Sequence, residues 1–397
     1  MKSDAARLHV RPEVAAIHER LISTRRDFHA HPELSWKESR TQAVVLERLR
    51  DLGLKDVRAI ARTGATGLIV GGKPGPCVLW RADMDALPIP EKTSLEYASE
   101  NPGVMHACGH DTHMAIALGI AEVLSARREA LAGSVRMVFQ PAEEAAGGAQ
   151  GCIADGILET PNVQRALGLH ISADVPLGAI NVAAGPFFAA PTYFKIEITG
   201  RGGHAAAPHQ AVDAIVVAAE AVSALQTIVS RSLPPSEQAV LTVGTMHAGF
   251  RWNVIADSAT LEGTVRSYTD HVREHMLARI DEVMTGICMA FGASFTLEHQ
   301  TSCPPLVNDP AVTGFVIEQA RSFFGPDYIH GAASMGAEDM GVFLRERPGC
   351  YFWLGARNEA KGIAGRHHDA GFVIDEDALA LGVEFGARLI EGSLATV

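Results

Sequence analysis

Residues 76–88 read PCVLWRADMDALP, a short apolar run that ends in two aspartates. Three similar runs lie at 66–72 (TGLIVGG), 134–144 (SVRMVFQPAEE) and 165–171 (RALGLHI), and residues 111–128 between them have the apolar spacing of a helix. This alternation of strand and helix predicts a mainly parallel sheet with helices on its faces. Ligands of such sheets bind beyond the carboxyl ends of the strands, so the segments that follow these runs are expected to be functional.

The pattern changes near Gly185 and Pro186, where the apolar runs give way to strict alternation. Residues 192–200 (TYFKIEITG) and 259–268 (ATLEGTVRSY) alternate with period two, which predicts an antiparallel sheet with one wet face. Two helical stretches, at about 211–231 and 270–290, accompany them. A smaller α+β domain is therefore expected in this part of the chain.

After residue 301 the first pattern returns, with YFWLGA at 351–356 as a buried strand. The expected fold class is α/β. A mainly parallel-sheet catalytic domain is formed by 1–185 and 301–397, and the smaller α+β domain, 186–300, is inserted into it.

Composition narrows the class of protein. The chain has 397 residues, with 47% hydrophobic and 20% charged residues, which is typical of a globular protein. The formal net charge of -12 argues against nucleic acid as a partner. The six cysteines are scattered, the first residues show no signal-type apolar core, and no apolar run appears long enough to span a bilayer. A reduced, cytoplasmic protein that does not enter a membrane is expected.

Metal-type side chains follow several of the predicted strands. They occur in four short stretches: ACGHDTH with Cys108, His110 and His113, PAEE with Glu143 and Glu144, GLH with His170, and GRHHDAGF with His367 and His368. Each would be unremarkable alone, because a single histidine after an apolar strand is usually a core residue. Together, thiolate, imidazole and carboxylate suit zinc, and the histidines and glutamates also suit manganese or cobalt. More than four candidates favour two metal ions.

These stretches, with RADMDALP, GRGGHAAAPH, NVIADSATLEGTVR and MGAED, resemble the M20 metallopeptidase family. The resemblance covers nearly the whole chain, from RRDFHAHPELSWKE to IDEDAL. It is strongest to the amidohydrolase branch, which contains hippurate hydrolase, bacterial N-acyl-amino-acid aminoacylases and plant auxin-conjugate hydrolases.

The resemblance implies a role for each of several residues. Two divalent metal ions, of zinc, manganese or cobalt, would be bound by a ligand set made of Cys108, His110, Glu144, His170 and one late histidine. Glu143 would be the general base. The remaining polar residues of these motifs would lie around the ligands and support them: Asp83, Asp85, Asp111 and His113.

The late histidine is the one place where the motif departs from the family. The family tends to have a proline two residues after the ligand histidine, where this chain has Ala370. Phe372 lies four residues after His368, as the family spacing requires, so His368 is the expected ligand. His367 remains the alternative, because the missing proline loosens the register.

The resemblance also gives the inserted domain a role as a lid that forms a homodimer. His204 of GRGGHAAAPH would stabilise the oxyanion in the active site of the partner subunit. Asn253 and Arg266 would help to hold the carboxylate end of the substrate.

The expected reaction is hydrolysis of the amide bond of a small N-acyl amino acid to a carboxylate and a free amino acid. Two alternatives stay open. One is a dipeptidase or carboxypeptidase of the same family. The other is a metal-bearing dimer that binds small molecules without turnover, although a binding protein would have no need of a general base such as Glu143.

Overall fold

The computed structural model describes residues 10–396, which form two compact units. The first unit contains the residues up to Phe187, then Val307–Ala333, and the chain from Asp339 onward. The second unit contains Phe188–Leu306 and Ser334–Glu338. The chain passes from one unit to the other within β7 (Gly185–Phe188) and β14 (Leu306–Asn308).

The first unit is built on an eight-stranded sheet. Its strands, in spatial order, are β1 (Lys55–Ile60), β2 (Gly64–Val70), β4 (Ala132–Gln140), β3 (Lys73–Asp83), β5 (Val163–Pro176), β16 (Gly349–Arg357), β6 (Ile180–Asn181) and β15 (Ile329–His330). The four central strands, β4, β3, β5 and β16, are parallel to one another. β1, β2 and β4 are joined antiparallel, and so are β16 and β6. The predicted α/β class with a mainly parallel sheet is confirmed.

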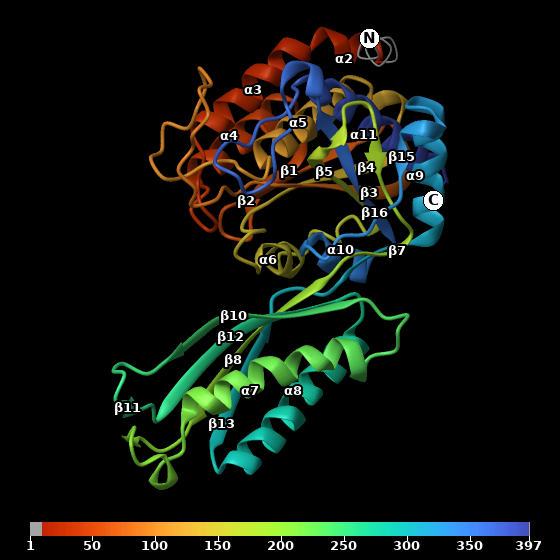
Figure 1. Ribbon diagram of the computed structural model, residues 1–397. Coiled ribbons are helices and arrows are strands. Elements are labelled where there is room, and N and C mark those ends of the chain that lie inside the picture. The colour runs from red at the N-terminus through yellow and green to blue at the C-terminus, as the bar shows by residue number, and fades with distance from the viewer. Residues whose placement is uncertain (1–9, 397) are drawn as a thin grey trace. The chain divides into compact units, whose positions relative to one another are not determined.

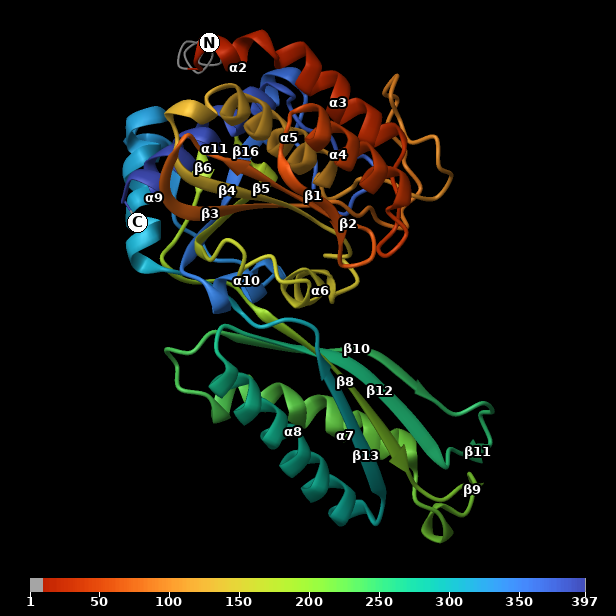
Figure 2. The ribbon, with the colours of Figure 1, turned by 180° about the vertical axis from the view of Figure 1, so that it is seen from behind.

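Helices cover both faces of this sheet (Figures 1 and 2). One face carries α2 (Pro12–Ala16), α3 (His18–Ala30), α4 (Ser39–Asp51), α5 (His110–Ala126) and α11 (Asp377–Thr396), and the other carries α6 (Gly148–Ala154) and α10 (Met340–Glu346). α9 (Pro310–Phe323) packs against α11 and β16. Because α3 and α11 both pack on α5, that helix is buried on nearly all sides, and after its polar first turn its sequence is mostly apolar.

The second unit is a four-stranded antiparallel sheet with two helices on one face (Figure 1). Its strands, in spatial order, are β10 (Ala239–Ala248), β12 (Ser258–Ser267), β8 (Ala190–Thr199) and β13 (Ser294–Thr301), and its helices are α7 (Ala214–Thr227) and α8 (Asp270–Phe291). Alternate side chains of β8, namely Phe194, Ile196 and Ile198, enter the core between sheet and helices. This is the half-buried sheet that the period-two pattern predicts.

Local sequence explains the ends of α8. Thr269 precedes the helix, and its Oγ1 accepts the N–H of Val272 at 3.2 Å, which caps the first turn. Gly292 follows the helix with φ of 71°, a left-handed conformation that glycine adopts without steric cost.

One helix is more apolar than the sequence analysis recognised. α7 continues into the single turn η3 (Ile228–Ser232), and the combined segment, Ala214–Ser232, is long and apolar enough to cross a membrane by length and composition alone. The buried side chains of this segment, including Val217, Ala221 and Leu225, belong to the core of the second unit. Packing against the sheet accounts for these buried residues, whereas Ile215 and Val216 of the same helix are 41% and 44% exposed.

Candidate metal centre

The parallel strands of the first unit bring the metal-type segments to one edge of the sheet. β3 lies between β4 and β5 and runs parallel to both, so the loops after Asp83 and Gln140 leave the sheet at the same edge. Arg81 of β3 pairs with Gly168 of β5, which sets His170 level with Asp83. The segment before α5 ends at this edge as well, with Cys108 close to His170.

α5 begins at His110 because of the glycine before it. Gly109 has φ of 89°, in the left-handed region, and a Cβ there would lie 2.4 Å from Cγ2 of Ile171. Glycine is therefore the residue that lets the chain turn against β5. The turn places Cys108 and His110 on either side of Gly109, both buried at the sheet edge.

Two groups of candidate ligands share the sulfur of Cys108. Cys108, His110 and Glu144 offer atoms that all lie within 4.8 Å of one another, and so do Cys108, His170 and His367. Cys108 Sγ is 3.4 Å from His170 Nε2. Two groups with a common thiol would suit two neighbouring cations.

The charge of the first group favours a cation. His110 is buried, which lowers its pKa, but Asp83, Asp85 and Glu144 outweigh the burial and raise this pKa to about 10. Burial, followed by the nearby carboxylates Glu144 and Glu143, raises the pKa of the Cys108 thiol well above its usual range. Both shifts arise from an excess of negative charge in a buried place, which a bound metal ion would neutralise.

The second group contains histidines held in the neutral form that ligates metals. Burial is the main cause that lowers the pKa of His170 well below its usual range, and the neighbouring His113 and His367 add to it. Burial and the nearby His113 lower the pKa of His367 to about 3. Neutral imidazole is the metal-binding form of histidine.

Two buried nitrogen atoms of the site bear on its fit to a metal ion. Among residues 10–396, His110 Nε2 and His367 Nδ1 are buried and have no hydrogen-bond partner. Nε2 of His367 is the acceptor for the N–H of Ala173, at 3.4 Å, which leaves Nδ1 as its ligand atom. Buried polar atoms are normally paired, so these two nitrogens fit coordination to a metal ion.

Asp85 contacts several of the segments that carry the candidate ligands. Its Oδ1 lies 3.3 Å from His110 Nδ1, and its carboxylate accepts the N–H groups of Glu143 (3.1 Å) and Glu144 (3.0 Å). The Ser35 hydroxyl also donates to it, at 2.6 Å. Burial raises the pKa of Asp85, but the contact with His110 and the other hydrogen bonds outweigh this and lower it. A carboxylate behind a metal-type histidine orients the ring.

A tight turn directs the two glutamates. Ala142, just before Glu143, has φ of 51°, unusual for a residue other than glycine, and its N–H donates to the buried Glu38 at 2.9 Å. Glu144 joins Cys108 and His110, while Glu143 is half-buried and near enough for its charge to raise the pKa of the Cys108 thiol. Sequence reasoning missed Glu38, which is one of three acidic residues in RRDFHAHPELSWKE and is not distinguished there from the other two.

The late histidines are arranged differently from the expectation. His367, not His368, joins Cys108 and His170, and its ring centroid lies 5.2 Å from that of His170. The His368 side chain is 52% exposed, and its Nε2 lies 3.2 Å from Glu144 Oε1. His368 has φ of 62°, and its N–H donates to Ala107 O at 2.8 Å, so the chain turns outward at this residue. We therefore move the proposed ligand from His368 to His367.

Asp111 supports the ligand loop through a buried network that the sequence analysis did not foresee. Its carboxylate accepts Arg25 Nε at 2.7 Å and lies 2.8 Å from His29 Nδ1. Arg25, His29 and Asp111 are all buried. Burial raises the pKa of Asp111, but the positive charge of Arg25 and the contact with His29 outweigh burial and lower this pKa below its usual range. This network ties α3 to the first turn of α5, directly after His110.

The remaining expected site residues belong to the second unit. β9 (Gly203–His204) pairs with β11 (Val254–Ile255), so His204 lies opposite Val254 and next to Asn253. His204 is exposed, and Arg266 is half-buried in β12. Asn253 Oδ1 is buried without a hydrogen-bond partner among the described residues.

The chain is similar to known proteins over nearly its whole length. The model of peptidase family M20/M25/M40 matches residues 79–392. The chain is 39% identical to thermostable carboxypeptidase 1 of Saccharolobus solfataricus, over 93% of this chain and 94% of that protein. It is 40% identical to N-acetyl-L-cysteine deacetylase of Bacillus subtilis, over 92% of this chain and 86% of that protein. The crystal structure of the Bacillus subtilis YxeP protein, a dinuclear metal-binding peptidase from the M20 family, has a TM-score of 0.84 at 34% identity, covering 96% of this chain and 100% of that one.

Proposed function

The chain belongs to peptidase family M20/M25/M40 and is a metal-dependent amidohydrolase, and we propose that its substrates are N-acyl amino acids. Hydrolysis would release a carboxylate and a free amino acid. The observation that carries the proposal is the pair of ligand groups that share Cys108, with Glu143 beside them. The family predicted from the motifs is confirmed, and with it the expectation of an enzyme. The alternative of a binding protein without turnover is set aside.

We propose two divalent metal ions, of zinc, manganese or cobalt. Cys108, His110 and Glu144 would hold one, and Cys108, His170 and His367 the other. When bound, the ions supply Lewis acidity and a water molecule that is acidic enough to react at neutral pH. The relative named as dinuclear supports this count, and the chemistry of the donors supports the choice of metals.

Glu143 is the proposed general base. Its backbone N–H donates a hydrogen bond to Asp85, which fixes the position of the Glu143 backbone. Glu144, its neighbour, belongs to the ligand group of Cys108 and His110, and Glu143 belongs to neither group that shares Cys108, so its carboxylate is the one proposed for proton transfer. The Glu143 carboxylate would take a proton from the attacking water and deliver it to the leaving amide nitrogen.

We propose that the second unit forms a homodimer and completes the site of the partner. His204 would donate a hydrogen bond to the developing oxyanion, and Asn253 and Arg266 would hold the substrate carboxylate. Phe250 and Trp252, in the turn before Asn253, are 85% and 89% exposed. Two large aromatic side chains this exposed in adjoining positions are typical of an interaction surface.

The proposed location is the cytoplasm. Five of the cysteines, Cys77, Cys108, Cys152, Cys288 and Cys350, are buried as free thiols, as is usual in a reducing compartment.

A carboxypeptidase remains the second candidate, because one relative bears that name and the same groups would cleave a peptide bond. A panel of N-acetyl amino acids, N-benzoyl amino acids and dipeptides separates the two. We expect faster turnover of the N-acyl compounds, loss of activity with a chelator, and recovery with manganese, cobalt or zinc. Faster turnover of dipeptides, measured as kcat/KM, would establish the peptidase instead.

A further inference from the structure

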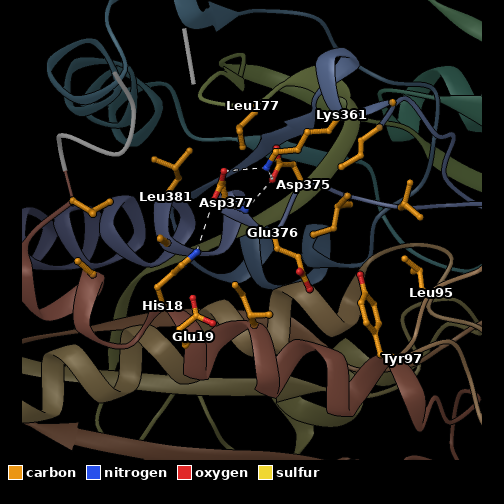
Figure 3. A pocket seen from close by; sticks show the side chains of 18 residues that line it. His18, Glu19, Leu95, Tyr97, Leu177, Lys361, Asp375, Glu376, Asp377 and Leu381 are labelled. Carbon is orange, nitrogen blue, oxygen red and sulfur yellow. Dashed lines mark hydrogen bonds and ion pairs between the residues drawn. The ribbon is translucent and has the colours of Figure 1, made fainter. Parts of the chain in front are cut away.

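The cavity drawn in Figure 3 lies beside a buried cluster of charged side chains in the first unit. Tyr97 and Glu376 line the cavity, and Figure 3 shows the Glu376 carboxylate near the hydroxyl group of Tyr97. Arg25 Nη1 donates to both, to the hydroxyl at 3.0 Å and to the carboxylate at 3.3 Å. The Tyr97 ring also packs edge-on against the ring of His29, with the ring centroids 5.5 Å apart. The cluster thus extends from this cavity to His29, which is on the same helix as Arg25.

His29 is fully buried, and each of its ring nitrogens faces a carboxylate. Nδ1 lies 2.8 Å from Asp111 Oδ2, and Nε2 lies 3.3 Å from Glu91 Oε1. An ionised carboxylate only accepts hydrogen bonds, so each nitrogen needs a proton to bond to its partner. A neutral imidazole carries one proton on its nitrogens and can bond to only one of the two carboxylates. The two contacts together therefore require the imidazolium form of His29.

The charges around the ring favour this form. The titratable and charged groups that act on it come from α3, α5 and the segment between β3 and α5: Arg25, Asp111, Glu91, Tyr97 and His106. Burial and the positive charge of Arg25 lower the pKa of His29, but the contacts with Asp111 and Glu91 outweigh them and raise it above its ordinary value. Burial raises the pKa of Glu91, but its hydrogen bonds, the one with His29 first among them, lower it to about 2. Glu91 is therefore ionised at neutral pH.

Asp111, the first of these carboxylates, belongs to the segment 106–111, the first ligand loop, which carries Cys108 and His110. Asp111 directly follows His110. Its Oδ1 accepts the N–H of Thr112 at 2.9 Å, while its Oδ2 is the atom in contact with His29. Because the carboxylate is held at both oxygens, its contact with His29 fixes the first turn of α5 at the point where His110 is carried.

Glu91, the second carboxylate, leads to the segment 366–372, the late ligand loop, which carries His367. Lys92, the residue after Glu91, donates its backbone N–H to Ala370 O at 2.8 Å. Ala370 lies only three residues after His367. Holding the Glu91 side chain in place therefore also holds the backbone against which the late ligand loop rests.

We propose that His29 is a positioning residue of the metal centre, which joins the first ligand loop to the late ligand loop. As an imidazolium it bonds to Asp111 and Glu91 at the same time, so it fixes candidate ligands from the two loops relative to one another. His29 belongs to no group of candidate ligands and acts only through its two partners. The role rests on the ligand groups proposed above, and its two tests are chosen so that one of them does not depend on these groups.

The first test is the protonation state of His29, which nitrogen-15 NMR of the zinc-loaded full chain measures directly. The His29 signal is assigned by its loss from the spectrum of His29→Gln. At about pH 7.5, one unit above the ordinary histidine pKa of about 6.5, we expect protons on both ring nitrogens. A ring with one proton at this pH would overturn the proposal, because it could not bond to both carboxylates.

The second test is a titration of the full chain with zinc against a chelator of known affinity. The neutral side chain of His29→Gln removes the imidazolium, so we expect the affinity for both zinc ions to fall about tenfold or more, as for other residues that orient ligands. His31→Gln is the matched control, because the His31 ring contacts Asp27 O at 2.8 Å and no candidate ligand loop. It should bind zinc as the wild type does.

A second pair of variants covers the case in which His29→Gln does not fold. Glu91→Ala breaks only the link to the late ligand loop and should weaken mainly the one zinc ion that His367 would bind, whereas Glu100→Ala, an exposed acid of the same segment, should have no effect. Equal affinities of these two variants would overturn the role. Wild-type protein that binds no zinc would overturn the ligand groups and this role together. Unchanged affinities of His29→Gln, beside a wild type that binds two ions, would overturn this role alone.

Discussion

His113 and Asp83 form a buried pair in which His113 Nδ1 lies 2.5 Å from Asp83 Oδ1. The second ring nitrogen of His113 accepts the N–H of Ile171 at 2.8 Å. Both nitrogens are thus engaged, and the ring links the end of β3 to β5 next to His170. Although His113, His110 and Asp83 lie close enough to hold a metal, His113 could ligate only by giving up one of these bonds.

His113→Gln is expected to keep the full number of metal ions at saturating metal, because no ligand is removed. Its affinity for metal should fall about 10–100-fold, as for other residues that hold ligands in place. Titration of the metal-free protein measures both quantities. A variant that lacks one equivalent of metal even at saturation would show that His113 is a ligand.

Removal of the shared sulfur should affect both metal positions. Cys108→Ala is expected to lose close to two equivalents per chain, whereas His110→Ala and His170→Ala should each lose mainly one, since each belongs to a single group. Elemental analysis of the purified proteins gives the counts. If Cys108→Ala loses only as much metal as His110→Ala, the sulfur is not shared.

The two late histidines provide a matched pair of variants. His367→Ala should be metal-poor, because His367 Nδ1 is the buried atom without a partner, whereas His368→Ala should retain its metal. The same elemental analysis applies. If His368→Ala is metal-poor and His367→Ala retains its metal, His368 is the ligand, and the loop must place this side chain toward the metal when metal is bound.

Glu143→Gln is expected to fold and bind metal normally but to lose about 10²–10⁴ in kcat, the usual contribution of general acid–base catalysis. The amide cannot accept the proton of water. Glu144→Gln, one residue away, is the control and should lose metal instead. Wild-type kcat in Glu143→Gln would remove this carboxylate from the mechanism.

The sequence could predict those parts of the fold and site that depend on local pattern. Period-two alternation in β8 and the apolar run of β3 are local, and fold class followed from them. The candidate ligands Cys108, His110 and Glu144 lie in short motifs, so their grouping was foreseeable.

Contacts between distant segments could not be predicted in this way. The Arg25–Asp111 ion pair joins residues that are 86 positions apart, and nothing in either segment reveals the partner. The choice between His367 and His368 depends on one backbone angle, the φ of 62° at His368. Where Ala370 replaces the expected proline, the motif no longer restricts the backbone at residues 369 and 370, directly after this turn.

The last prediction concerns His204 and the proposed dimer. His204 Nδ1 accepts the N–H of Ala206 at 3.0 Å, so in the neutral ring the proton is on Nε2, which can donate to another molecule. Its exposure at the end of β9, beside Asn253, would suit a surface residue equally well. The two roles differ in what His204→Ala does. An oxyanion donor contributes about 2.7–4 kcal/mol to the transition state, so kcat should fall about 10²–10³-fold with metal content unchanged.

Subunit mixing then tests whether this donor acts across the dimer. His204→Ala and Glu143→Gln are each expected to be nearly inactive. After exchange, the hybrid would contain one site with an intact Glu143 and a His204 from the partner subunit. Random exchange makes half of the dimers hybrid, each with one working site, so on the order of a quarter of the wild-type activity should return. If mass spectrometry confirms hybrids and no activity appears, His204 does not act in the partner's site.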